Sequence, residues 1–479
     1  MGDTLKQKAA SGMFWAVGER LLTQGTLFII SIVLARLLTP SEYGTLSILL
    51  VFTNLADVLV TNGLGEALIR RPEVSRQDYS TVFICGLALA VLLYCLLYML
   101  SPWLATFYGL QDIALYLRVL ALRIPFSSFN AIQKAYVAKN FLFKKQFSAT
   151  FLSSALSGIV AIALAYCGAG IFALIAQQLC TVIFTSVFLY AAARWLPGIS
   201  FSFKSFKEVV PTGFQFCGAS LVNALYTEGR SLLIGKVYSS ADLAYFNRGN
   251  QFPSLVVSNL NTPISNVMLP VMAEVNEDKK KLKAVTQKSM QLAAFVVFPM
   301  MGILAMCSEA LVRLLLTEKW LECVPYLQAS CLFFLFQPLQ TMNWQALKAA
   351  GQGSLCLRLE LIKKIVAFLL LAVALPFGVM AISISSIVSG LFSMLVNMHP
   401  NKSVLSYGIR EQALDMIRPL FASLIAMACS FVVGLLPVSN LVRLFLQVLV
   451  PLTVYLIASR LIGSEGYAIL CDECRSRMK

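Results

Sequence analysis

Hydrophobic residues in this sequence form long, nearly continuous stretches separated by short polar segments. A helix that crosses a bilayer needs about 20 mostly apolar residues, and stretches of that length recur along the whole chain. The pattern predicts about fourteen membrane-spanning helices, near residues 13–36, 43–62, 81–101, 113–136, 147–166, 170–193, 211–236, 243–272, 289–307, 325–347, 359–376, 379–398, 417–436 and 441–462. The first, fourth, seventh and eighth stretches include polar residues, so about twelve spans are the alternative count.

The composition agrees with an all-α integral membrane protein. Of the 479 residues, 58% are hydrophobic and only 13% are charged. A soluble protein carries roughly 25% charged residues, so this chain has too little polar surface for an ordinary soluble enzyme or a disordered protein. Most of the 12 cysteines lie in or beside the apolar stretches, where cysteine behaves as a small hydrophobic residue, and no disulfide framework is predicted.

The basic residues predict the orientation of the spans. The chain has 38 Lys and Arg against 23 Asp and Glu, a net charge of +15. With the N-terminus inside, 28 of the 38 fall on inner loops and tails; the outer ends hold Arg36, Lys236, Arg313, Lys319 and Arg443, and the spans hold Arg20, Arg118, Arg123, Arg230 and Arg248. This excess of inner Lys and Arg predicts that both termini are cytoplasmic, and it accounts for the net charge without a nucleic-acid partner.

Two internal echoes predict a repeat. A shift of 200 residues aligns Ala35–Gly44 with Gly235–Ala244; each segment has a basic residue, a Ser/Thr turn and an acid that opens the next helix. A shift of 212 aligns Gln133–Asn140 with Gln345–Gln352. The echoes divide the chain into an N-terminal lobe (1–200, spans one to six), a C-terminal lobe (201–400, spans seven to twelve) and spans thirteen and fourteen with a cytoplasmic tail (401–479). Six spans per lobe make the repeats parallel, an arrangement that commonly encloses a central path.

Several motifs resemble one known family. The segment Gly63–Arg71 with its charged continuation to Asp78 resembles the stretch after the second helix of Wzx-type bacterial polysaccharide flippases. Three further segments share the resemblance: Met268–Met272, the charged run Glu274–Lys283, and Glu318–Trp320 followed by Pro325. The likeness covers nearly the whole chain and thins after about residue 400. The family sits in the superfamily that also contains multidrug exporters and lipid II flippases.

The resemblance implies both a fold and an activity. The fold has two six-helix lobes, arranged in a V around a cationic central cavity, and two extra C-terminal helices. The implied mechanism is alternating access. The activity is the flipping of an undecaprenyl-diphosphate-linked oligosaccharide across the bacterial inner membrane for lipopolysaccharide or exopolysaccharide assembly. The implied partners are this lipid-linked oligosaccharide, membrane lipids, and polysaccharide polymerase and chain-length machinery. The sugar itself is not implied.

Arginines within the spans are the candidate binding residues for the diphosphate. Each costs roughly 2.5 to 3.5 kcal/mol at a helix centre, so they should face water or the interior of the bundle. Arg230 and Arg248 lie about 9 Å from the outer ends of their spans, Arg123 lies near mid-membrane, and Arg20 lies in the cytoplasmic third. A guanidinium stays charged and can bind phosphate oxygens with two donors at once.

Helix pairing is the alternative role for these arginines. Three acids within the spans, Glu19, Asp57 and Glu228, are candidate charge partners or candidate coupling sites for an ion or a proton. Glu19 and Glu228 are one and two positions from the nearest arginine in sequence, so those neighbours do not share a helix face well.

Two rival functions follow from other features. An ion-coupled multidrug antiporter of the same superfamily would have the same fold, although its cavity should be acidic or apolar for cationic drugs. A membrane enzyme of glycan assembly would need an acidic constellation or a large extramembrane domain, and no Asp-x-Asp occurs. No metal or cofactor site is predicted, because His399 is the only histidine and the Cys471–Cys474 CxxC stands alone.

Overall fold

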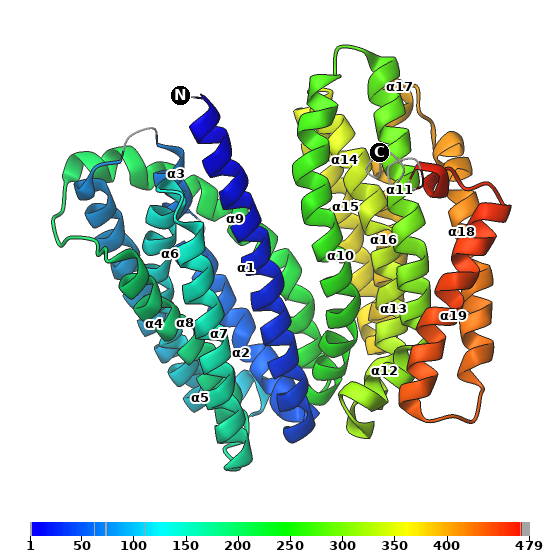
Figure 1. Ribbon diagram of the computed structural model, residues 1–479. Helices are drawn as coiled ribbons and strands as arrows, with labels where there is room; N and C mark the ends of the chain where they lie inside the picture. The colour runs from blue at the N-terminus through cyan, green and yellow to red at the C-terminus, as the bar shows by residue number, and fades with distance from the viewer. Residues whose placement is uncertain (1, 62, 72–73, 111, 470, 472–479) are drawn as a thin grey trace. The chain divides into compact units, whose positions relative to one another are not determined.

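The structure consists of α-helices joined by short turns. The computed structural model describes residues 2–61, 63–71, 74–110, 112–469 and 471, and no strand occurs among them. The helices of the first half are α1 (Gly2–Leu37), α2 (Pro40–Thr61), α3 (Leu64–Arg70), α4 (Arg76–Tyr108), α5 (Ile113–Ala121), α6 (Arg123–Lys139), α7 (Phe143–Tyr166), α8 (Ile171–Ala193), α9 (Phe203–Val237) and α10 (Ser240–Glu274) (Figure 1). Those of the second half are α11 (Lys279–Met306), α12 (Ser308–Leu315), η1 (Glu318–Cys323), α13 (Val324–Leu335), α14 (Gln337–Ala349), α15 (Gly353–Ala374), η2 (Leu375–Phe377), α16 (Val379–Met398), α17 (Asn401–Leu405), α18 (Ile409–Gly434) and α19 (Asn440–Leu461). The all-α prediction is confirmed.

Each predicted span coincides with one helix or with two consecutive helices. The fourth span is the pair α5 and α6, and the tenth is the pair α13 and α14. Among the described residues, 9 helical segments are long and apolar enough to cross a membrane by length and composition alone. The chain is therefore a multi-pass membrane protein, and the predicted fourteen spans are consistent with its helices. The predicted spans that are not among these 9 segments are α9, α10, α15 and the two interrupted pairs.

Proline explains both interruptions. Pro125 is the third residue of α6 and Pro338 the second of α14. A proline inside a helix has no N–H to donate and its ring clashes with the carbonyl four residues back. The chain accommodates each proline with a tighter turn just before it, in which the N–H of Leu122 donates to the Val119 carbonyl (3.3 Å) and that of Phe336 to the Phe333 carbonyl (3.4 Å). The spans aligned by the second sequence echo thus share the same local break.

The turns aligned by the first echo have the same capping geometry. The N–H and hydroxyl of Thr39 donate to the Glu42 carboxylate at 2.7 and 2.8 Å, and those of Ser239 donate to the Asp242 carboxylate at 3.1 and 2.6 Å. The two turns also touch, since the Ser41 and Ser240 hydroxyls lie 3.1 Å apart. A Cβ on Gly44 would lie 1.6 Å from the Ser240 carbonyl oxygen, so this close approach requires glycine.

The chain divides into two compact units, Met1–Ala244 and Tyr245–Lys479. In the first unit α7 packs against α1 and α8, while α9 packs against α2, α3 and α4. In the second unit α11 packs against α13, α14 and α18, and α15 packs against α16. The unit boundary falls within α10, whereas the sequence echoes divide the chain at residues 200 and 400. The division into lobes 1–200 and 201–400 with an appended segment 401–479 stays a prediction.

A half-buried carboxylate, that of Asp415, joins α18 to α11 in the second unit. Both Asp415 oxygens accept hydrogen bonds from the Gln287 amide at 3.0 and 2.9 Å, and one also accepts from the Gln291 amide at 2.9 Å. The hydroxyl of Tyr407, a fully buried residue in the turn before α18, donates to the other oxygen at 2.6 Å. Three side chains therefore fix Asp415 on the face of α18 that packs against α11.

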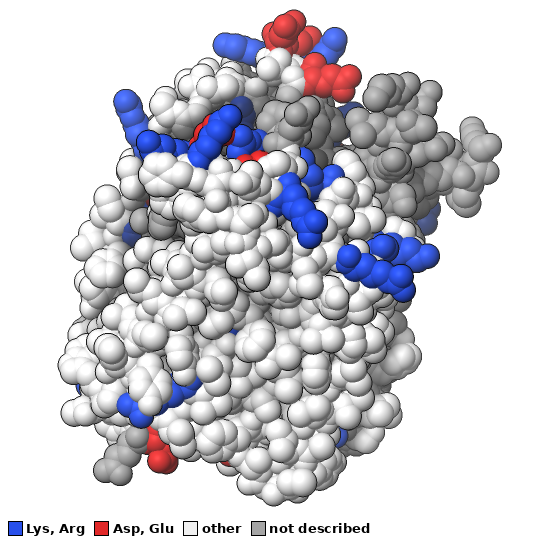
Figure 2. All heavy atoms as spheres, turned by 90° about the vertical axis from the view of Figure 1, so that its left-hand side faces the viewer, with Lys and Arg blue, Asp and Glu red and all other residues white. Residues whose placement is uncertain are grey.

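The outer surface of the helices suits a bilayer. Large apolar side chains point outward, for example Met99 of α4 (77% exposed) and Val373 of α15 (68% exposed). On the face shown in Figure 2, Lys and Arg gather toward one end, and a broad region without charged side chains lies below them. Such a region is the expected contact surface for hydrocarbon chains. Of the CxxC motif in the tail, Cys471 is described, whereas residues 472–474 lie outside the described residues.

Candidate functional site

A polar stripe on α6 lines a pocket in the first unit. Arg123, Ser127, Asn130 and Lys134 follow one another at steps of four, three and four residues, which places them on one face of the helix. All four line a pocket of about 550 Å³. Its other polar residues are Thr61 of α2, Gln146 of α7, and Thr181 and Thr185 of α8. Among the described residues its lining contains two cations and no acid, so it is a cationic pocket surrounded by amide and hydroxyl groups.

Arg123 is held at the deep end of the pocket by an acid from another helix. Its guanidinium lies 2.7 Å from the carboxylate of Asp57 on α2, and the two side chains are 13% and 14% exposed. A second guanidinium nitrogen donates to the Gln178 amide oxygen at 3.5 Å. The Arg123 Nε and Asp57 Oδ1 atoms are buried and have no hydrogen-bond partner among the described residues. The pair thus stabilises the charge on Arg123 within the unit.

Lys134 is a pocket residue that the sequence analysis did not name: it falls at the inner end of the fourth predicted span and was counted among the inner basic residues. It lies about three turns after Arg123 on the same helix, toward the end of the pocket near Phe143 and Gln146. Its side chain is exposed, unlike that of Arg123. The spacing of polar residues along 123, 127, 130 and 134 is a signal that could have identified it.

Glu19 lies next to the pocket without lining it. Its carboxylate accepts hydrogen bonds from the Gln146 amide (3.2 and 3.0 Å) and from the Thr150 hydroxyl (3.0 Å), both on α7. Because Gln146 lines the pocket, one side chain separates Glu19 from the pocket interior. The α1 helix is thereby linked to the wall that carries the binding groups.

The structure does not bring the other predicted arginines of the first unit into this pocket. Arg20 on α1 and Arg230 on α9 are partly buried and engage other groups. Glu228 accepts a hydrogen bond from the Asn54 amide at 3.3 Å, which links α9 to α2. Arg118 donates to the Ser101 hydroxyl at 2.8 Å and lies over the Tyr98 ring.

Arg248 belongs to the second unit and is packed against an aromatic residue. It is 4% exposed, donates to the Gln251 amide oxygen at 2.6 Å, and its guanidinium carbon lies 5.0 Å from the centre of the Trp320 ring. Trp320 belongs to the Glu318–Trp320 motif and is fully buried. Gly249 allows this packing, because a Cβ there would lie 2.7 Å from the Leu327 nitrogen on α13. These contacts are typical of a structural arginine.

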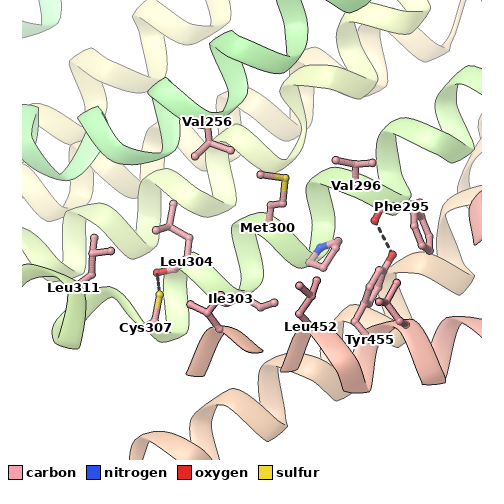
Figure 3. A pocket seen from close by; sticks show the side chains of 13 residues that line it. Val256, Phe295, Val296, Met300, Ile303, Leu304, Cys307, Leu311, Leu452 and Tyr455 are labelled. Carbon is pink, nitrogen blue, oxygen red and sulfur yellow. Dashed lines mark hydrogen bonds between the residues drawn. The ribbon is translucent and has the colours of Figure 1, made fainter. Parts of the chain in front are cut away.

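A second pocket, in the second unit, is almost entirely apolar. It has a volume of about 470 Å³ and lies where α10, α11 and α12 meet α19. Its lining includes Val256, Met300, Ile303 and Leu452, and the Tyr455 hydroxyl donates to the Phe295 carbonyl at 2.7 Å (Figure 3). The hydroxyl is therefore occupied, and the pocket can accept hydrocarbon only.

Comparison with known proteins identifies the family. The family model described as polysaccharide biosynthesis protein matches residues 33–325, which is more than half of the chain. The chain belongs to this family. The match includes α6 with its polar stripe and the Trp320 motif, so the resemblance to Wzx-type flippases is confirmed.

Two relatives of this polysaccharide biosynthesis protein cover most of its length. The succinoglycan biosynthesis transport protein ExoT of Rhizobium meliloti (strain 1021) is 24% identical over 352 residues, 73% of this chain and 71% of that protein. The lipopolysaccharide biosynthesis protein WzxC of Escherichia coli (strain K12) is 22% identical over 440 residues, 90% of this chain and 89% of that protein.

Solved structures share the fold. The lipid II flippase MurJ in an inward closed conformation superposes with a TM-score of 0.75 at 16% identity, covering 94% of this chain and 98% of that one. An inward-facing multidrug resistance transporter of the MATE family gives a TM-score of 0.62 at 13% identity, covering 80% and 95%. This chain thus has the same fold as these two transporters.

Proposed function

We propose that this protein is a flippase that translocates an undecaprenyl-diphosphate-linked oligosaccharide from the inner to the outer leaflet of the bacterial cytoplasmic membrane, for surface polysaccharide assembly. The cationic pocket on α6 is the observation that carries the proposal. A diphosphate presents several anionic oxygens at fixed spacing, and Arg123 offers a planar fork while Lys134 offers a compact charge. The named relatives act in succinoglycan and lipopolysaccharide biosynthesis, which supports a glycan-linked substrate.

The remaining intramembrane charges have different proposed roles. Arg20 and Arg230 are further proposed contacts for the diphosphate, whereas the packing of Arg248 on Trp320 favours a structural role. Asp57 is the charge partner of Arg123. Glu19 and Glu228 accept hydrogen bonds from neutral amide and hydroxyl groups, and they are the proposed coupling sites for a proton or a cation.

The proposed setting is the bacterial inner membrane with both termini in the cytoplasm. The excess of Lys and Arg on the predicted inner loops supports this orientation. In it, Lys134 lies nearer the cytoplasmic side than Arg123, so a diphosphate would meet Lys134 first. The proposed transport needs no covalent chemistry and no cofactor, and the polysaccharide polymerase and chain-length machinery are proposed downstream partners.

Deletion of the gene tests the proposal. We expect an undecaprenyl-linked glycan to accumulate on the cytoplasmic face, measured by mass spectrometry of extracted lipids, while surface glycan falls. Loss of drug resistance with normal lipid-linked glycan would instead assign the protein to multidrug export. Accumulation of a glycan with a shortened sugar chain would indicate an enzyme of glycan assembly.

Lys134→Gln tests the pocket itself. Because Lys134 is exposed, its substitution should leave membrane abundance unchanged while export falls about tenfold, the effect of losing one charge-assisted contact. Lys145→Gln is the matched control, since Lys145 is also exposed, lies on the adjacent α7 and does not line the pocket. Equal export by the two variants would exclude the α6 pocket from the transport path.

A further inference from the structure

The first unit has another polar pocket at the end opposite to Lys134. It has a volume of about 320 Å³ and is formed by the first turn of α2, the first turn of α5 with the segment before it, and the short connection between α7 and α8. We name it the terminal pocket. Because α2, α7 and α8 all run the length of the unit, the terminal pocket and the α6 pocket lie at opposite ends of the same helices. The charge distribution assigns the terminal pocket to the outer side.

The lining of the terminal pocket differs in charge from that of the α6 pocket. Its described ionisable residues are Glu42, Asp112 and Tyr116, with no Lys or Arg among them. The described lining of the α6 pocket has Arg123 and Lys134 and no acid. An anion such as a diphosphate would therefore be repelled from the terminal pocket, because two carboxylates at close range oppose a further negative charge.

Both carboxylate oxygens of Glu42 lie against neighbouring groups at the wall of the terminal pocket. Its Oε2 accepts hydrogen bonds from the Thr39 N–H and hydroxyl at 2.7 and 2.8 Å, which fixes the side chain. Its Oε1 faces Gly170, where a Cβ would lie only 2.6 Å away. Gly170 also has a φ of 55°, a conformation that favours glycine. The connection thus requires glycine both for its backbone conformation and because Glu42 packs directly against it.

Two aromatic rings contribute an apolar wall. The Tyr116 and Phe172 rings meet edge to face with their centres 5.2 Å apart, and Phe172 is 39% exposed although it lines the pocket. Ser41, Thr45 and Tyr116 add hydroxyl groups. Carboxylates that accept hydrogen bonds, hydroxyls that donate or accept them, and an aromatic face against which C–H groups can pack together match the surface of a pyranose ring.

We propose that the terminal pocket binds a sugar unit, neutral or amino-substituted, of the transported glycan. The inference rests on the proposed function, which supplies the glycan. The volume lies at the lower end of the roughly 300–1,000 Å³ of small-molecule sites, so one or two sugar units fit. A metal site is less well matched, because no group of three or more His, Cys, Asp or Glu side chains comes together among the described residues.

Saturation-transfer NMR on the purified full chain in nanodiscs tests the proposal. The probes are glucose, galactose, N-acetylglucosamine and glucosamine, each at millimolar concentration. We expect transfer to the ring protons of at least one probe, and about tenfold weaker binding with Asp112→Asn, which removes a charged acceptor, or with Phe172→Ala, which removes the aromatic wall. The matched controls are Glu322→Gln and Tyr166→Ala, an exposed acid and an exposed aromatic residue outside the pocket, and they should bind as the unmodified chain does.

A third variant guards against an indirect effect of the first two. Ala169→Trp fills the terminal pocket without changing its charge and should also abolish transfer. Absence of transfer from every probe, or equal transfer by all variants, would overturn the proposal. A change in the protein's chemical shifts on addition of MgCl₂ that is lost in Asp112→Asn, without any sugar signal, would assign the pocket to a cation. That result would also overturn the proposal.

Failure of this inference can be separated from failure of the proposed function. Sugar binding is measured on purified protein, whereas glycan export is measured in cells with the Lys134→Gln variant. Normal lipid-linked glycan after gene deletion would refute the flippase assignment whatever the NMR result. Export that depends on Lys134, together with no sugar binding at the terminal pocket, would refute only the inference drawn here.

Discussion

The contact between Asp57 and Arg123 allows substrate binding to be separated from helix pairing. Three variants are needed: Asp57→Asn, Arg123→Gln, and the two combined. Each single substitution leaves one charge partly buried opposite a neutral amide. The combined variant leaves no charge, and two amides of similar size can still bond to each other across α2 and α6.

The expected free-energy changes follow from burial. Removing one partner of a buried ion pair costs about 3–5 kcal/mol, and replacing both by neutral groups is often close to neutral. Since the two side chains keep 13% and 14% exposure, the lower value of about 3 kcal/mol applies to each single variant. That is a large part of the roughly 5–15 kcal/mol that holds a domain folded, so membrane abundance should fall in both singles and recover in the double.

Export gives the second measurement. In a deletion strain that expresses each variant, abundance is read by immunoblot and surface glycan by mass spectrometry, with Lys145→Gln as the control. We expect the double variant to reach the membrane yet fail to export, because the guanidinium that we propose as a phosphate ligand is gone. Normal export by the double variant would show that Arg123 only pairs helices. Normal abundance of both single variants would refute the reasoning from burial.

Three further predictions concern topology and packing. Single cysteines at Ser75, Asn276 and Ser403, in a background without accessible cysteines, should resist an impermeant maleimide added to spheroplasts, while cysteines at Asp112 or Ser439 should react; labelling at position 276 would invert the C-terminal half. Tyr407→Phe should lower the free energy of unfolding by about 1.5–3 kcal/mol, because the hydrogen bond to the Asp415 carboxylate is lost; thermal unfolding in detergent measures this, and an unchanged Tm would mean that the bond contributes nothing. Gly44→Ala should reduce abundance, since its Cβ would overlap the Ser240 carbonyl oxygen, whereas Gly229→Ala, with no atom within 4 Å, should not; equal abundance of the two would contradict the close approach of these turns.

The hydrophobic pattern was sufficient to locate the spans because the bilayer sets their length. It did not predict the interruptions at Leu122 and Phe336, because a single polar residue, Arg123 or Gln337, follows each of them and only Pro125 and Pro338 signal a break. The predicted fourth span, 113–136, contains Lys134, whereas the count of basic residues grouped Lys134 with the inner loops, so it was not named as a site residue. The free-energy cost of a charged residue within a span correctly indicated that Arg123 needs contact with water or a charge partner.

Contacts between distant segments could not be read from the sequence. Asp57 and Arg123 are 66 positions apart, and the choice of Asp57 among the intramembrane acids depends on how α2 packs against α6. The resemblance implied a cationic cavity, and Arg248 was a candidate residue for it. In the structure Arg248 packs against Trp320, a contact between distant segments that the sequence does not reveal. The terminal pocket also went unpredicted, because its residues come from three separate connections, each of which looks like an ordinary turn.

The partnership between α2 and α6 has a consequence for how the chain enters the membrane during synthesis. Proteins are made from the N-terminus, so α2 reaches the bilayer before α6 does. The α2 helix is long and apolar enough to cross a membrane despite Asp57, whereas the fourth span is divided between helices of 9 and 17 residues, the second of which begins with Arg123. The Asp57 carboxylate therefore enters the bilayer before the Arg123 guanidinium does. The fourth span should then depend on the second span for stable insertion. Membrane insertion by this route requires that Asp57 precede Arg123 in the sequence.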